Sequence, residues 1–371
     1  MRVLSVFGTR PEAVKMAPVV RELKRTPGIE APVCVTAQHR QMLDQVLELF
    51  DLHPDLDLDL MRDDQSLAQM SAAIFTHLDP VLEKLKPDWV LVQGDTTTVA
   101  VTSLLAYYRR IRVGHVEAGL RTHDKWQPFP EEINRRVASV VADLHFAPTE
   151  WARRNLQAEG IPGQAIAVTG NPVIDALRVV SERPEPEAIS RLLSGLGVGP
   201  GGRRLILVTA HRRENFGAPL EEICAALKEL AGRGDVELVY PVHLNPNVHT
   251  PVRRLLGETA HVTLLPPQDY LPLVHLMKRA SLVLTDSGGI QEEAPTFGVP
   301  VLVLRQVTER PEGVEAGVLK LVGTSRRLIL AEAGRLLDDP AAYAGMAHAA
   351  NPFGDGTAAE KIVHALLDFR P

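Results

Sequence analysis

The chain is poor in cysteine. Its 371 residues include only two cysteines, Cys34 and Cys224, which lie far apart and belong to no CxxC pair. A zinc module built on such pairs is therefore excluded, and the spacing argues against a disulfide framework. The turn Gly8-Thr9-Arg10-Pro11-Glu12, which follows the apolar run Val3–Phe7, matches neither GxGxxG nor a Walker A loop, so the usual dinucleotide and P-loop sites are excluded there.

An excess of positive charge is also missing. Lysine and arginine number 40 against 46 acidic residues, which leaves a net charge of −6. Such a chain is a poor candidate for gripping nucleic acid, which needs a concentrated positive surface. No apolar run approaches the roughly 20 residues that cross a bilayer, and the opening MRVLSVFG lacks the features of a secretory signal. We expect a cytoplasmic protein that binds neither nucleic acid nor membrane.

What the chain does have is a regular alternation of short apolar runs and longer amphipathic stretches. The runs are continuous rather than alternating, as expected of strands buried on both faces of a parallel sheet. This rhythm predicts a doubly wound α/β fold. The expected strands are Val3–Phe7, Val33–Thr36, Trp89–Val92, Val113–Val116, Leu144–Ala147, Ile166–Thr169, Leu205–Val208, Val236–Tyr240, Val262–Leu265, Leu282–Thr285 and Val301–Leu304.

One segment interrupts the pattern. Ser181–Arg203 has prolines and glycines clustered at its two ends, as is typical of a connection between domains. About 180 residues precede it and about 170 follow, which is enough for one ordinary core in each half. Two α/β domains of similar size predict an active site in the cleft between them.

Polar residues of the first half follow the expected strands, where open α/β sheets collect their ligands. Arg10 and Lys15 lie beside a helix start and suit a phosphate, although a surface role explains them equally well. Asp95 either caps the next helix or belongs to a functional site. Glu131 either stabilises a helix through its favourable charge at the N-terminus or belongs to the same site as Asp95. With Glu117, these carboxylates suit acid–base chemistry or stabilisation of positive charge.

Polar residues of the second half also follow strands. His211, Arg212 and Arg213 would attract an anion, although a solvated loop is the commoner explanation for such a run. The small residues Ser287, Gly288 and Gly289 at a helix start suit a diphosphate, or simply a tight turn. One turn further on, Glu293 is placed to accept ribose hydroxyls. Arg310 either reaches the same site or pairs with a neighbouring glutamate.

These motifs together resemble the non-hydrolysing UDP-N-acetylglucosamine (UDP-GlcNAc) 2-epimerases, almost from Met1 to the C-terminal helix. The matching segments are VFGTRPEAVKMAP, TAQHRQMLDQV, QGDTTT, GHVEAGLRT, PEEINR, HRREN, YPVHLNPNV, LTDSGGIQEEAP and TERPE. The resemblance implies two Rossmann-like domains in the glycosyltransferase-B arrangement, residues 1–180 with the returning helix 353–371 and residues 200–352. It also implies a homodimer and the reversible conversion of UDP-GlcNAc to UDP-ManNAc through loss and return of UDP.

The resemblance also assigns roles to residues. It implies catalysis by Asp95, Glu117, Glu131 and His211. It implies contacts with the UDP portion by Arg10, Lys15, Gln268, Ser287, Gly288, Gly289, Glu293 and Arg310. Where the family often has an aromatic residue near the uracil, this chain has Leu273, so an apolar contact replaces ring stacking. The implied chemistry needs neither a cofactor nor a metal.

Other functions remain open from the sequence. A hydrolysing epimerase of the same fold would release UDP and free ManNAc, because water rather than UDP adds at C1. A glycosyltransferase on the same scaffold would need an acceptor. A two-lobed protein that senses a nucleotide sugar would tolerate amides in place of its carboxylates.

Some bacterial members of the family bind a second, activating UDP-GlcNAc. The resemblance carries this role onto Gln38, Gln41, Glu131, Arg212 and His243. Those members have a basic residue just ahead of the position of Gln65, whereas this chain has Asp63 and Asp64, with Arg62 displaced. Since like charges repel in a partly dry site, we expect activation that is retained but weaker.

Overall fold

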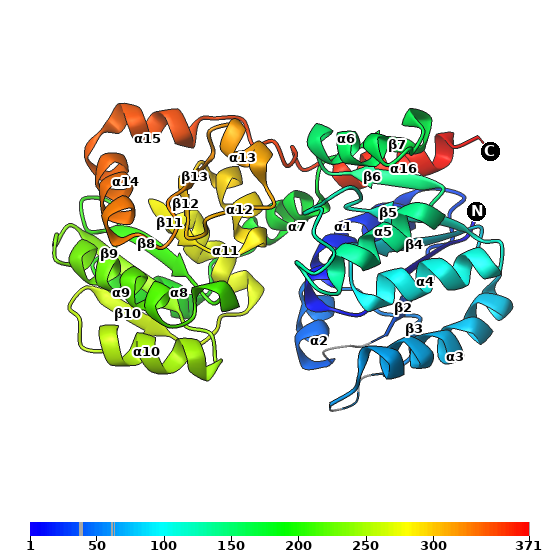
Figure 1. Cartoon of the computed structure of the whole chain (residues 1–371), viewed down its shortest axis with the longest axis horizontal. Coiled ribbons are helices and arrows are strands. Elements are labelled where there is room, and N and C mark those ends of the chain that lie inside the picture. Colours follow the sequence, from blue (N-terminus) through cyan, green and yellow to red (C-terminus); the bar gives the residue numbers. More distant parts are fainter. Residues whose placement is uncertain (37–39, 61, 63, 371) are drawn as a thin grey trace. The chain divides into compact units, whose positions relative to one another are not determined.

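The structure is a computed structural model that describes residues 1–36, 40–60, 62 and 64–370. The chain contacts divide it into two compact units (Figure 1). Unit 1 comprises Met1–Ala176 with the C-terminal segment from Phe353, and unit 2 comprises Leu177–Pro352.

Unit 1 is built on a seven-stranded parallel sheet in the order β3-β2-β1-β4-β5-β6-β7. Valine-rich runs form its central strands, which are buried on both faces. The strand order reverses between β1 and β4. In a doubly wound sheet this is the point where a crevice forms outside the carboxyl ends of the strands. The strands are β1 (Val3–Phe7), β2 (Val33–Val35), β3 (Leu56–Asp57), β4 (Trp89–Gln93), β5 (Arg112–Val116), β6 (Leu144–Ala147) and β7 (Ile166–Val168).

Helices of unit 1 form two packed groups. α3, α4 and α5 contact one another in sequence, whereas α1 packs against α2 and against α16 from the end of the chain (Figure 1). α1 and α3 bury one apolar face, as an amphipathic pattern requires, whereas α4 is buried nearly all round. Their bounds are α1 (Arg10–Arg25), α2 (Arg40–Leu49), α3 (Leu67–Leu85), α4 (Thr97–Tyr108), α5 (Glu131–Val141), α6 (Glu150–Ala158) and α16 (Ala358–Asp368); α7 (Pro172–Ser181) crosses into unit 2.

Unit 2 repeats the same strand order with six strands, β10-β9-β8-β11-β12-β13, all parallel. The strands are β8 (Arg204–Thr209), β9 (Val236–Pro241), β10 (Val262–Leu265), β11 (Leu282–Thr285), β12 (Val301–Val303) and β13 (Leu319–Leu321). The helices are α8 (Glu187–Gly195), α9 (Ala218–Ala231), α10 (Pro246–Leu256), α11 (Tyr270–Arg279), α12 (Gly288–Glu293), α13 (Pro311–Glu315), α14 (Arg326–Asp338) and α15 (Pro340–Ala347).

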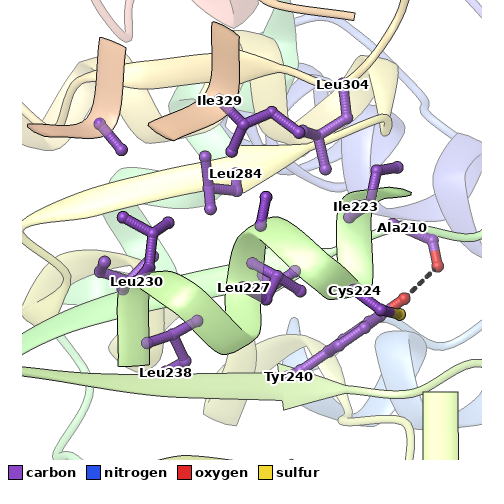
Figure 2. Packing of buried hydrophobic residues seen from close by; sticks show 14 of the residues in the cluster. Ala210, Ile223, Cys224, Leu227, Leu230, Leu238, Tyr240, Leu284, Leu304 and Ile329 are labelled. Atoms are coloured by element: carbon purple, nitrogen blue, oxygen red, sulfur yellow. Dashed lines mark hydrogen bonds between the residues drawn. The ribbon is translucent and has the colours of Figure 1, made fainter. Parts of the chain in front are cut away.

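The core of unit 2 lies between its sheet and α9. Leu227 and Leu230 of α9 pack with Leu238 and Leu284 of the sheet (Figure 2). Tyr240 is buried at the edge of this cluster, and its hydroxyl donates to the carbonyl oxygen of Ala210 at 2.6 Å. Burial of the apolar surface of these side chains is the main contribution to the stability of such a unit.

The predicted fold class, two doubly wound α/β units, is confirmed, and every strand that we expected is present. The sequence did not lead us to expect β3 or β13, which are two and three residues long and lie at the outer edges of their sheets. Ser181–Arg203, which we expected to connect the domains, contains helix α8 and groups with unit 2. Within the described ranges, every helix falls short of the length and apolarity that spanning a membrane requires.

Candidate active site

Three neighbouring strands of unit 1, β1, β4 and β5, are each followed by polar residues. Because the strands are parallel, these residues meet at the carboxyl edge of the sheet, where its order reverses. A pocket of about 390 Å³ opens there. Its lining includes four of the predicted site residues, Lys15, Asp95, Glu117 and Glu131.

Glu117 is surrounded by hydrogen-bond donors. It follows β5 with a positive φ of 64°, which turns its side chain at the end of the strand, and it is buried. The ammonium of Lys15 lies 2.6 Å from its Oε1, and Asn171 donates to the same oxygen at 2.8 Å. Gln93 donates to Oε2 at 2.5 Å. These donors stabilise the charged carboxylate at a fixed position.

Glu12, which sequence reasoning did not single out as a site residue, ties the loops after β1 and β4 together. Its Oε2 accepts from the backbone N–H groups of Gly8 at 2.8 Å and Thr9 at 2.6 Å, and its Oε1 accepts from the Thr96 hydroxyl at 2.6 Å. Burial raises the pKa of this carboxyl. Gly8 has to be small, because a Cβ there would lie 2.0 Å from the hydroxyl oxygen of Thr36.

Asp95 is not a helix cap. The N-cap of α4 is Thr96, whose hydroxyl accepts from the backbone N–H of Val99. The carboxylate of Asp95 instead forms an ion pair with Arg135 of α5, and its carbonyl oxygen accepts from Asn134 at 3.0 Å. The capping alternative for Asp95 is therefore wrong, and the side chain remains available to a site, 28% exposed.

Two adjacent glutamates begin α5 and face different surroundings. Glu131 is half-buried and lines the pocket. Glu132 is fully buried, accepts from the backbone N–H groups of Thr122 and His123 at 3.1 and 3.2 Å, and lies 3.3 Å from Arg135. The structure thus gives Glu132 a role in holding the loop before α5 and leaves Glu131 at the pocket.

Two buried histidines, His115 and His145, lie side by side on β5 and β6. Nε2 of His115 contacts the carbonyl oxygen of Gly94 at 2.7 Å. Burial lowers the pKa of His115 to about 4 and that of His145 to about 3. Both rings are therefore neutral at physiological pH, and they support the strand ends rather than carry charge.

His211 of unit 2 follows β8, and its partner is Asp286 after β11, the next strand in the sheet. Asp286 accepts at Oδ2 from the backbone N–H of His211 at 2.8 Å, and its Oδ1 lies 3.6 Å from the Nδ1 of that residue. Burial lowers the pKa of His211, and the carboxylate of Asp286 acts in the opposite direction. The sequence indicated His211 but gave no sign of a role for Asp286.

Arg212 and His243, the predicted activator residues of unit 2, lie beside His211. The rings of His243 and His211 stack with centroids 5.4 Å apart. The backbone N–H of Arg212 donates to Asp286 at 2.8 Å. Of the predicted glutamines, Gln38 lies outside the described residues and Gln41 falls in α2 of unit 1.

The predicted diphosphate residues gather around α12. Ser287 is its N-cap residue, and a Cβ on Gly288 would lie 3.3 Å from the guanidinium carbon of Arg310. Arg310 is buried and donates to Glu292 at 2.7 Å and to Glu309 at 2.9 Å. Arg310 thus pairs with neighbouring glutamates while its guanidinium lies beside the start of α12.

The remaining predicted residues occupy separate positions. Gly289 and Glu293 lie on α12, where Glu293 is buried and influences Tyr270, whose pKa burial raises well above its usual range. Gln268 and Leu273 are half-buried before and within α11, and Arg10 is the first residue of α1. Among the described residues, no three His, Cys, Asp or Glu side chains are grouped so as to hold a metal ion.

Asn171 is a further contributor that the sequence did not indicate. It is fully buried, donates to Glu117, and its own backbone N–H donates to the carbonyl oxygen of Phe353 at 2.7 Å. Its context, Thr169-Gly170-Asn171-Pro172, reads as an ordinary turn. Nothing local to that turn signals that a side chain 54 positions from Glu117 will reach it.

Known proteins share this sequence and fold along the whole chain. The sequence profile of the family described as UDP-N-acetylglucosamine 2-epimerase matches residues 21–367. A relative from Salmonella typhimurium, named UDP-N-acetylglucosamine 2-epimerase, is 54% identical over 373 residues, which cover 100% of this chain and 99% of the relative.

Solved structures agree. The UDP-GlcNAc 2-epimerase from Neisseria meningitidis bound to UDP-GlcNAc matches with a TM-score of 0.92 and 49% identity, covering 100% of both chains. S. aureus MnaA, solved with UDP, matches with a TM-score of 0.88 and 45% identity, covering 98% of this chain and 95% of the other.

Proposed function

The chain belongs to the UDP-N-acetylglucosamine 2-epimerase family, and we propose that it interconverts UDP-GlcNAc and UDP-ManNAc without hydrolysis. It is thus an isomerase. The UDP-GlcNAc and UDP held by the related Neisseria and S. aureus structures support this substrate class.

The observation that carries the proposal is the pocket of unit 1. Asp95, Glu117 and Glu131 all line it, and Lys15 stands against Glu117. Carboxylates gathered in one pocket suit a reaction that develops positive charge on a sugar ring and moves a proton. A protein that only sensed the sugar would have no need of this set.

The reaction has to begin at C1, because the C2 proton of the sugar is not acidic. The C1–O bond breaks, UDP leaves with the bonding electrons, and C1 gains oxocarbenium character. A carboxylate then takes the C2 proton to give 2-acetamidoglucal. Return of a proton to the opposite face, with UDP adding again at C1, produces the epimer. We assign Asp95, Glu117 and Glu131 to charge stabilisation and proton movement, and His211 to catalysis with them.

We assign binding of the UDP portion to residues of both units. Basic groups and helix N-termini stabilise a departing diphosphate, and Leu273 offers the base an apolar contact. The residues assigned to UDP are Arg10, Lys15, Gln268, Leu273, Ser287, Gly288, Gly289, Glu293 and Arg310. We propose further that the enzyme acts in the cytoplasm and that it is a homodimer. Light scattering of the purified protein measures the mass of the assembly and so tests the homodimer.

The decisive experiment is NMR of UDP-GlcNAc with the purified enzyme in heavy water. We expect an equilibrium mixture of UDP-GlcNAc and UDP-ManNAc with deuterium at C2, because the proton passes through exchangeable side chains. Activity should persist in EDTA and without added NAD. Accumulation of free ManNAc as the major product would instead show a hydrolysing enzyme.

The activator site remains a proposal. Arg62, the displaced basic residue, donates to the carbonyl oxygen of Asp59 at 2.9 Å, and Asp63 lies outside the described residues. We therefore keep the expectation of weaker activation at Gln38, Gln41, Glu131, Arg212 and His243. The test starts from pure UDP-ManNAc. A reverse reaction that is wholly absent until micromolar UDP-GlcNAc is supplied would show a fully functional activator site.

A further inference from the structure

Asp286 is a buried carboxylate whose two oxygens are used very differently. Its side chain is fully buried at the end of β11. Oδ2 accepts three hydrogen bonds, from the backbone N–H groups of His211 and Arg212 at 2.8 Å each and from Asn215 at 3.0 Å. Oδ1 has no hydrogen-bond partner among the described residues. Leaving a buried charged oxygen without a donor is costly.

The imidazole of His211 is the donor placed to satisfy Oδ1. Its Nδ1 lies 3.6 Å away, which is too long for a hydrogen bond. The backbone N–H of His211 already donates to Oδ2, so rotation of the side chain is the movement by which Nδ1 would approach Oδ1. Hydrogen bonds of catalytic groups are often long in the absence of substrate and tighten when it binds.

One face of the His211 ring stacks on the ring of His243. The two rings stack with an interplanar angle of 16°. Nδ1 of His243 accepts from the backbone N–H of Asn245 at 3.1 Å, which fixes that ring in turn. His211 therefore lies between a stacked ring and a carboxylate, with 37% of its side chain exposed.

We infer that Asp286 is a positioning residue for His211. Its Oδ1 accepts a hydrogen bond from the Nδ1–H of the ring, so that Nε2 is left as the atom that takes up or releases a proton during epimerisation. This inference rests on the proposed function, which makes His211 catalytic. When Nε2 takes up a proton, the carboxylate stabilises the resulting imidazolium, as in other histidine–carboxylate pairs.

The charged and titratable groups that act on His211 are Asp286, Arg212 and His243. Arg212, His243 and burial all lower the pKa of His211, and only Asp286 raises it. Tyr240, which Asp286 also influences, has its pKa raised well above the usual range and donates its hydroxyl to Ala210. Loss of the Asp286 carboxylate should therefore lower the pKa of His211.

The test is Asp286→Asn in the full-length enzyme. The carbonyl oxygen of the amide can still accept the three donors of Oδ2, while its NH₂ faces Nδ1 and forces the opposite tautomer. We expect kcat to fall about 10²–10⁴-fold, since the same change in a serine protease triad costs about 10⁴. KM for UDP-GlcNAc should change little, and the limb of the pH profile due to His211 should move to lower pH.

A direct readout needs no substrate. ¹⁵N NMR of the wild-type enzyme near pH 8 should show His211 protonated at Nδ1, and Asp286→Asn should show it protonated at Nε2. Wild-type His211 protonated at Nε2 would overturn the inference, even if the variant failed to fold. An Asp286→Asn variant with reduced kcat but an unchanged tautomer and pH profile would also overturn it, because Asp286 would then be structural.

Glu237→Gln is the matched control. Glu237 is a buried carboxylate of the same unit, its Oε2 lies 3.3 Å from Nδ1 of His261, and it lies near the other end of its strand. We expect its kcat and pH profile to match the wild type. If the wild-type enzyme did not epimerise UDP-GlcNAc at all, the proposed function would fail, whereas the tautomer measurement would still decide the role of Asp286.

Discussion

The two sheets of this chain share one strand order, yet the helices that follow their central strands begin differently. α1, after β1, starts with a complete capping box, in which Thr9 and Glu12 each satisfy a backbone N–H of the other. α12, after β11, starts at Ser287, whose side chain makes no capping bond to any described residue. The first helix start is therefore capped by its own side chains, whereas the side chain of Ser287 provides no such cap.

The residues around these starts differ in the same sense. In unit 1 the carboxylates Asp95 and Glu117 are each paired with a cation, Arg135 and Lys15. In unit 2 the corresponding edge carries a histidine beside a buried aspartate. The comparison teaches that strand order decides where polar groups meet, whereas the side chains decide which chemistry they support. A helix start by itself does not identify a phosphate site.

The largest expected effect concerns the carboxylates of unit 1. Glu117→Gln and Asp95→Asn should each lower the rate about 10²–10⁴-fold, the usual scale for a general acid or base. Gln at 117 would also bring its NH₂ against donors that now face a carboxylate. Initial rates of UDP-ManNAc formation measure this effect, and far-UV circular dichroism should be unchanged.

Asp79→Asn is the control for that pair. Asp79 forms an exposed ion pair with Arg109 in unit 1, outside the pocket lining. We expect wild-type turnover from it, because exposed pairs contribute little. Near-wild-type turnover by both Glu117→Gln and Asp95→Asn would remove the catalytic assignment of unit 1 and leave the edge of unit 2 as the site of chemistry.

The second expected effect is a loss of stability in acid, which arises from the two buried histidines of unit 1. The pKa of His115 is lowered to about 4 and that of His145 to about 3, against about 6.5 in an unfolded chain. Between these values the unfolded state binds more protons, so the stability that these rings confer is complete above pH 6.5 and is lost as the pH falls. The loss should be on the order of a few kcal/mol for each ring at the acid end.

His145→Gln removes one of these titrations while its amide keeps a donor for the carbonyl of Ala142. We expect the fall in urea midpoint between pH 7 and pH 4.5 to be smaller than in the wild type. His53→Gln, at a side chain that is 90% exposed, should leave that fall unchanged. Equal acid sensitivity of the wild type and His145→Gln would contradict the burial argument.

The smallest effect separates the two helix starts. Thr9→Ala should lower the free energy of unfolding by about 1 kcal/mol, the usual cost of losing a side-chain cap. Ser287→Ala should cost less, because that side chain caps nothing in the described structure. It should instead raise KM for UDP-GlcNAc. Urea unfolding measures the two stabilities and steady-state kinetics measures KM. Equal losses of stability would show that the two helix starts are alike and would contradict the prediction.

Sequence reasoning succeeded where a signal is local. Continuous apolar runs such as Trp89–Val92 predicted buried parallel strands, and the polar residues that follow them, among them Asp95 and Glu117, indicated where a site forms. It failed for β3 and β13, because two or three residues are too few to show a periodicity. It could not decide which of two neighbours caps α4, because Asp95 and Thr96 are both residue types that commonly cap helices; the cap in the structure is Thr96.

By itself, then, the sequence determined the alternation of strands and helices, the exclusion of a zinc module built on CxxC pairs, and the residue types at the strand ends. Only the tertiary structure decided the partners. Asn171 reaches Glu117 from 54 positions away, and Asp286 lies 75 positions from His211. The physical reason is that parallel strands bring together residues from distant crossovers. The contact that sets the charge or tautomer of a side chain is then made by a group that no local pattern contains.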